Sequence, residues 1–148
     1  MKWRTSSDAA ANALRVLPKL AESYFDAGRK AASRKRSAKA LHRFRISTKR
    51  FRYALELFQP VYDGNLDRRL KALRKLQDAL GAISDCQTIL EILQGDQAVE
   101  SKVKRVMSRR TKEFRTQWQA FDSPGQLKQW RDFLARESRS QPPRRSAA

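Results

Sequence analysis

Apolar residues recur at intervals of three and four along nearly the whole of this 148-residue chain. That spacing is typical of amphipathic α-helices, and no segment shows the alternation of a half-buried strand. The periodic segments predict five helices, over residues 5–33, 36–59, 66–94, 96–120 and about 125–137. Because short turns join long helices, we expect an all-α fold, an antiparallel four-helix bundle with a short fifth C-terminal helix.

The length and the breaks in the pattern indicate one domain. We expect residues 1–137 to form the bundle and residues 138–148, which are polar, basic and contain proline, to form a disordered tail. Pro18 lies inside the first predicted helix, where it is expected to weaken or kink it.

The charge balance is the strongest indication of function. Lys and Arg number 33 against 15 Asp and Glu, which leaves a net charge of +18. So large an excess of one sign calls for an anionic partner. One cysteine and one histidine exclude Cys-type zinc sites and two-histidine metal motifs, so we expect no metal and no cofactor. No apolar run reaches membrane-spanning length, and we expect a soluble, cytoplasmic protein with no membrane contact.

The cations are most concentrated between Arg29 and Arg52, where eleven Lys or Arg occur and no Asp or Glu. At about 100° per residue, four side chains fall within an arc of about 80° that runs about 15 Å along the helix. These four, which we call the cation row, are His42, Arg45, Lys49 and Arg52. Like charges stacked in this way destabilise a bare helix, and a bound polyanion would relieve that cost.

The same helix has two apolar sides. Opposite the cation row lie four apolar residues that predict the core-facing side, Phe44, Phe51, Leu55 and Phe58. Residues Ile46, Tyr53 and Leu57 form a second apolar strip. That strip either packs on the first or fifth helix of its own chain or forms the contact of a homodimer.

Further cations lie away from the predicted core sides of their helices. These additional candidates for anion binding are Arg50, Arg15, Lys19, Lys71, Arg74, Lys102, Arg105, Arg109 and Lys112. The abundance of arginine favours phosphate, because its planar group binds oxygens in pairs. The alternative interpretation is a basic surface that serves solubility alone.

Three other features of the helix over 66–94 have structural interpretations. Asp78 and Asp85 lie on one side of it and would suit acid–base chemistry or Mg²⁺, but pairing with cations of a neighbouring helix is the simpler expectation. Gly81 is expected to permit close helix packing. Cys86 is expected to be an unreactive core residue.

Two segments resemble the CHAD family of helical domains. Residues 41–58, LHRFRISTKRFRYALELF, match its His-x-x-Arg-[Val/Ile]-x-x-[Lys/Arg]-x-x-Arg pattern, and residues 73–90, LRKLQDALGAISDCQTIL, match its Leu-Gly-x-x-x-Asp segment. The resemblance implies an all-helical fold of two four-helix bundles that binds inorganic polyphosphate without catalysis. It also implies that the cation row contacts polyphosphate and that the protein is recruited to polyphosphate granules.

The chain departs from this family in having one histidine motif where a full domain has two. It therefore resembles a half-domain, and two copies in a homodimer would restore the two-bundle arrangement. Non-specific binding of DNA or RNA is the alternative function, since a basic chain fits both polyanions. A phosphate-processing enzyme has less support, because the sequence has no glycine-rich phosphate loop and no acidic metal cluster.

Overall fold

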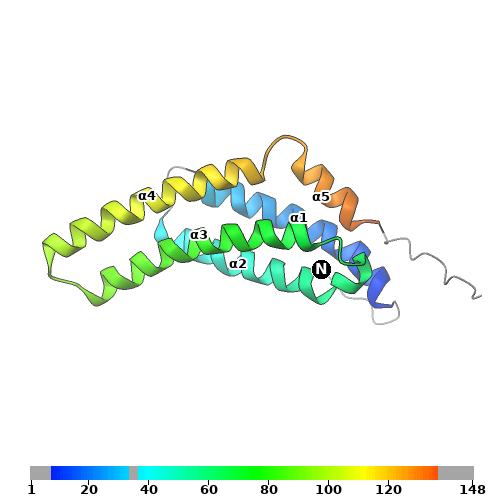
Figure 1. Ribbon diagram of the computed structural model, residues 1–148, viewed down its shortest axis with the longest axis horizontal. Helices are drawn as coiled ribbons and strands as arrows, with labels where there is room; N and C mark the ends of the chain where they lie inside the picture. The colour runs from blue at the N-terminus through cyan, green and yellow to red at the C-terminus, as the bar shows by residue number, and fades with distance from the viewer. Residues whose placement is uncertain (1–7, 34–36, 137–148) are drawn as a thin grey trace, which may run out of the picture.

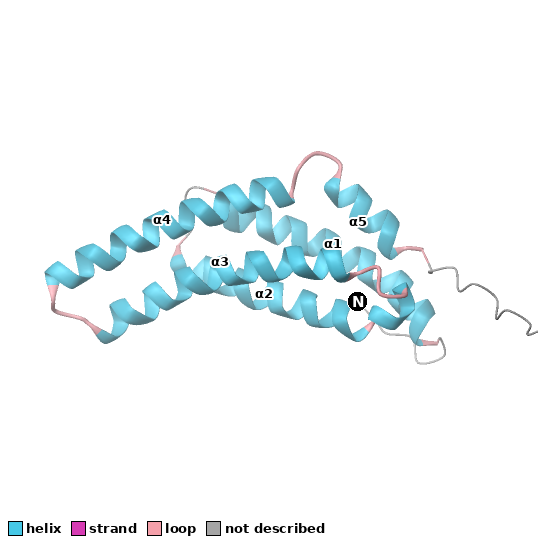
Figure 2. Ribbon diagram, viewed as in Figure 1, coloured by secondary structure: helices cyan, strands magenta, loops and turns pink. Residues whose placement is uncertain are grey.

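The computed structural model describes residues 8–33 and 37–136, and within those ranges it contains helices and no strands. The elements are α1 (Ala9–Ala32), α2 (Ala38–Leu57), the 3₁₀ helix η1 (Gln59–Tyr62), α3 (Asp67–Ile92), α4 (Gln97–Phe121) and α5 (Gln126–Leu134). The all-α prediction is confirmed, and each predicted helix is present with ends shifted by a few residues (Figure 2). The predicted tail over 138–148 lies outside the described residues.

Successive helices pack as neighbours, as the short connections predict. α1 contacts α2, α2 contacts α3, α3 contacts α4, and α4 contacts α1, while α5 packs on α1. Figure 1 shows that the hairpin of α3 and α4 reaches beyond the end of the α1–α2 pair. The result is a four-helix bundle with a short fifth helix at one side and a projecting two-helix end.

Side-chain caps fix where three of the helices begin. Asp8 accepts a hydrogen bond from the Ala11 N–H at 2.7 Å, and Asp96 accepts one from the Val99 N–H at 3.1 Å. Ser37 caps α2 in the same way. Such caps satisfy N–H groups that have no partner inside the helix. α1 runs through Pro18 as one helix, so the expected weakness there does not end it.

Aromatic side chains fill the core between α1, α2, α4 and α5. Tyr24 stacks on Phe44 and Phe51, with ring centroids 5.1 and 4.8 Å apart, and meets Trp118 edge-on. The Tyr24 hydroxyl lies 3.1 Å from the Thr48 hydroxyl, which itself donates to the Phe44 carbonyl. The predicted core side of α2 is therefore confirmed. Because that side is buried in the bundle, the remaining sides of α2 face α3 and solvent.

The second apolar strip of α2 does not pack within the chain. Tyr53 and Leu57 are 53% and 73% exposed, and Ile46 is exposed as well. Of the two alternatives for the strip, packing on α1 or α5 is wrong, because burial of the core side of α2 leaves the strip on the solvent side of that helix. The homodimer contact stays a prediction. None of the helices described is both long and apolar enough to cross a membrane.

Candidate functional site

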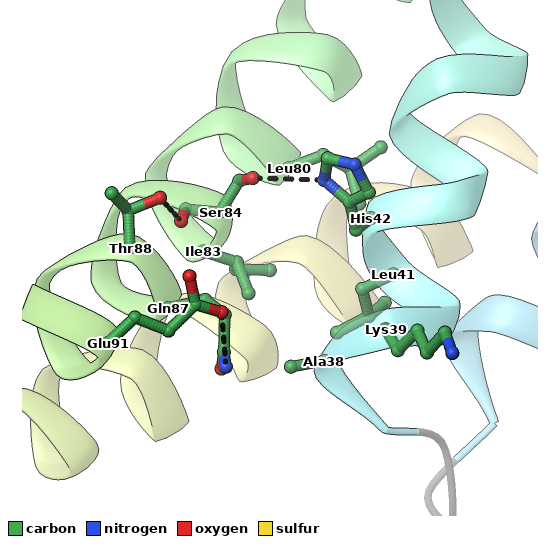
Figure 3. Close-up of a pocket in the computed structure, with 10 residues that line it drawn as sticks. All are labelled: Ala38, Lys39, Leu41, His42, Leu80, Ile83, Ser84, Gln87, Thr88 and Glu91. Atoms are coloured by element: carbon green, nitrogen blue, oxygen red, sulfur yellow. Dashed lines mark hydrogen bonds between the residues drawn. The ribbon is translucent and has the colours of Figure 1, made fainter.

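The cation row lies along the edge of α2 that borders α3. His42 Nδ1 is 3.2 Å from the Ser84 hydroxyl of α3, as Figure 3 shows. One turn further, Arg45 extends over Gly81, where an added Cβ would lie 3.8 Å from the Arg45 Nε. That is an ordinary contact, so Gly81 leaves room beneath an arginine. The expectation that Gly81 is a point of close helix packing is therefore wrong. The row is thus part of a surface shared by two helices.

The first three members of the row have no carboxylate partner among the described residues. No ion pair of the described chain includes His42, Arg45 or Lys49. The Arg45 Nε is shielded from solvent and has no hydrogen-bond partner in the described part of the chain. No described carboxylate therefore competes with an external anion for these three side chains.

The fourth member, Arg52, has an internal counterion. Its guanidinium donates to Glu56 at 3.0 Å, and the same carboxylate oxygen accepts from Arg74 of α3 at 3.2 Å. Glu56 therefore joins a cation of α2 to a cation of α3 at one end of the row. Its charge offsets part of theirs, so an anion that binds at this end of the row competes with an internal carboxylate.

A hollow of about 430 Å³ opens beside His42, between the first turns of α2 and the second half of α3. Leu41 and Ile83 line it with apolar side chains, and His42 and Ser84 bring polar groups to it (Figure 3). Glu91 lies at the far side and accepts from Gln87 at 3.4 Å. The hollow makes the His42 end of the row concave.

The other predicted cations lie on different parts of the surface. Arg74 joins the row through Glu56, and Arg50 lies beside the groove between α1 and α2. Six predicted cations lie on the sides of α1 and α4 that face away from the buried residues, namely Arg15, Lys19, Lys102, Arg105, Arg109 and Lys112. A seventh, Lys71, lies exposed on α3. Arg15 also donates to Asn12 at 2.9 Å. No described contact joins these seven to the cation row, and their part in binding stays a prediction.

Sequence reasoning did not include Glu56 and Ser84 in the site. Glu56 lies four residues after Arg52, a spacing at which helical ion pairs form, so the sequence contained a signal for it. Ser84 has no such signal, since only the packing of α3 on α2 brings it to His42.

The acidic residues of α3 do not form the expected pairs. Asp78 and Asp85 are exposed, and neither pairs with a described Lys or Arg. No group of three metal-ligating side chains occurs in residues 8–33 and 37–136. Cys86 is buried, as expected.

The fold and this surface define a strongly basic helical bundle whose cations form a row between two helices. The family model described as CHAD domain matches residues 2–94, which is more than half of the chain. The chain therefore belongs to the CHAD domain family. The match includes α1, α2 and α3 and ends before α4. Neither the curated proteins nor the solved structures contain a match to this chain.

Proposed function

We propose that this chain binds inorganic polyphosphate along the cation row, without changing it chemically. The observation that carries the proposal is the run of His42, Arg45 and Lys49 on one side of α2 with no carboxylate partner in the described chain. Membership of the CHAD domain family supports it. Recruitment to polyphosphate granules would follow from such binding.

The shape of the row favours an extended anion over a compact one. Four residues spaced over ten positions of a helix extend about 15 Å, which one phosphate cannot contact at once. Each cation that meets a phosphate also releases a condensed counterion, an effect established for nucleic acids. Affinity should therefore rise steeply with the number of phosphates and fall steeply with salt.

Calorimetric titration against polyphosphates of increasing length tests the proposal. We expect Arg45→Ala and Lys49→Ala each to weaken binding of long chains by roughly 1–3 kcal/mol, as charge-assisted contacts usually do. Lys128→Ala is the matched control, because it removes one positive charge from α5, where Lys128 already pairs with Asp132 at 2.6 Å. Equal effects of all three variants would show that net charge, and not the row, determines binding.

Non-specific binding of nucleic acid is the second candidate function, favoured by the net charge of +18. Competition between long polyphosphate and duplex DNA, at equal concentrations of charge, separates the two. Stronger displacement by polyphosphate supports the first function, and stronger displacement by DNA supports the second.

A further inference from the structure

Exposed apolar side chains gather in two separate places on the described surface. Contiguous groups of this kind mark interaction surfaces, whereas single exposed apolar residues need no explanation. One group lies on α2 and the other where α3 ends; the six large side chains are Ile46, Tyr53, Leu57, Ile89, Ile92 and Leu93. Every large apolar side chain that is exposed in the described ranges belongs to one of these two groups.

Cations flank the group on α2. Arg43 and Arg50 are both exposed and lie one helical turn from Ile46, on the side of the strip nearer α1. On the other side, the Arg52 guanidinium lies over the Tyr53 ring, 4.7 Å from its centroid. We call the set Arg43, Ile46, Arg50, Tyr53 and Leu57 the basic strip.

Carboxylates flank the group on α3. Asp78 and Asp85 fall within about 60° of Ile89 and Ile92 around the helix, on the side away from its buried residues. Both aspartates are exposed and have no described ion-pair partner. The 26 residues from 76 to 101 contain five Asp or Glu and no Lys or Arg. All 33 Lys and Arg of the chain lie outside this segment. We call the set Asp78, Asp85, Ile89 and Ile92 the acidic strip.

The two strips have the same spacing and opposite charge. Two arginines and a leucine occupy positions 43, 50 and 57, and two aspartates and an isoleucine occupy positions 78, 85 and 92. A seven-residue interval keeps side chains on one side of a helix, as helix pairs require. Each strip extends about 21 Å.

We propose that the acidic strip of one copy of this chain docks on the basic strip of a second copy, with Arg50 opposite Asp85. Each chain has both strips, so two copies can make the contact twice and close as a dimer. The apolar residues at positions 57 and 92, which are both 73% exposed in one chain, become covered.

Charge favours the acidic strip of a second copy as the surface that covers the basic strip. A second copy is repelled by most of the surface of a chain with a charge of +18, so it can approach the basic strip only with a locally acidic surface. The segment over 76–101 provides one. A polyanion would neutralise the arginines of the basic strip but would offer Ile46, Tyr53 and Leu57 no apolar surface to pack on.

Sedimentation velocity over a range of protein concentrations, without polyphosphate and at about 0.15 M salt, tests the contact. We expect a reversible monomer–dimer equilibrium. Arg50→Glu and Asp85→Lys should each weaken it at least about tenfold, because each places like charges opposite one another. The double variant, R50E together with D85K, should restore it. Lys128→Glu makes the same charge change as Arg50→Glu on α5, outside both strips, and should leave dimerisation as in the unmodified chain.

Circular dichroism checks that each variant is folded, and Ile92→Lys offers a second disruption of the contact that leaves both members of the ion pair in place. A chain that stays monomeric at every concentration overturns the proposal. So does a dimer that neither charge reversal weakens, or a double variant that is folded and remains monomeric. Because polyphosphate is absent from these experiments, their outcome is independent of the proposed function.

Discussion

The indole ring of Trp118 in α4 lies directly on Gly28 in α1, so closely that a Cβ at position 28 would overlap the ring. Both residues are buried, and the ring also meets Phe25 edge-on, 5.9 Å between centroids. The absence of a side chain at position 28 is what lets α4 pack against α1.

Gly28→Ala should therefore lower the free energy of unfolding by about 1–3 kcal/mol, because overpacking forces a rigid ring out of place. Gly81→Ala is the matched control. It has open space apart from the Arg45 contact at 3.8 Å, and replacing a helical glycine by alanine gains up to about 1 kcal/mol in helix propensity. Urea unfolding of the two variants should give changes of opposite sign, and two losses of similar size would contradict this account.

Removing the shared carboxylate of α2 should tighten polyphosphate binding. Glu56→Gln frees Arg52 and Arg74 from their internal counterion and removes a negative charge from the end of the cation row. Partly exposed ion pairs contribute little, so the free energy of unfolding should fall by no more than about 1 kcal/mol. Calorimetry at several salt concentrations should show higher affinity and a steeper salt dependence than the unmodified chain. Weaker binding would mean that Glu56 acts mainly by holding the two arginines in position.

The cations of α4 should matter for long polyphosphates and not for short ones. Lys102 and Arg109 lie on the outer side of α4 and have no described contact with the cation row. A chain of a few phosphates can occupy the row alone, whereas a long chain can extend to α4 as well. We expect the variant with both Lys102→Ala and Arg109→Ala to bind short polyphosphates normally and long ones more weakly.

Titrations of that variant and of Arg45→Ala against the same set of chain lengths make the comparison. The Arg45 variant should lose affinity at every length. If the α4 variant also loses affinity for the shortest chains, the primary site includes α4.

Alkaline pH should destabilise the fold through buried tyrosines. Burial raises the pKa of Tyr62 to about 12, and it also raises the pKa of Tyr24. Because the neutral phenol is favoured in the folded state, its contribution to stability is complete below pH of about 10, the ordinary pKa of tyrosine. The contribution is then lost as pH rises toward 12, because the tyrosine ionises at lower pH in the unfolded chain than in the folded one.

Thermal melts between pH 8 and pH 12 check this expectation. Tyr62 donates to the Leu134 carbonyl at 2.9 Å, so Tyr62→Phe should cost about 1 kcal/mol at neutral pH. Above pH of about 10, however, its melting temperature should fall less steeply than that of the unmodified chain. Lysines lose protons in the same interval in both proteins, so the difference between the two slopes isolates the tyrosine. Parallel slopes would contradict the assignment.

The helices, the core side of α2 and the cation row could all be predicted from the sequence. Each depends on the period of the α-helix, which fixes within one segment which side chains share a side. Phe44, Phe51 and Leu55 are buried together for that reason, and His42, Arg45, Lys49 and Arg52 lie along one edge.

Only the tertiary structure decided what each side of a helix meets. The rotation of α3 against α2 places Ser84 beside His42 and Gly81 beneath Arg45, and it brings Arg74 to the carboxylate that Arg52 already contacts. The same packing leaves Ile46, Tyr53 and Leu57 exposed. These contacts join residues many positions apart, and their geometry is set by how side chains of separate helices interlock, which helical periodicity within one segment cannot specify.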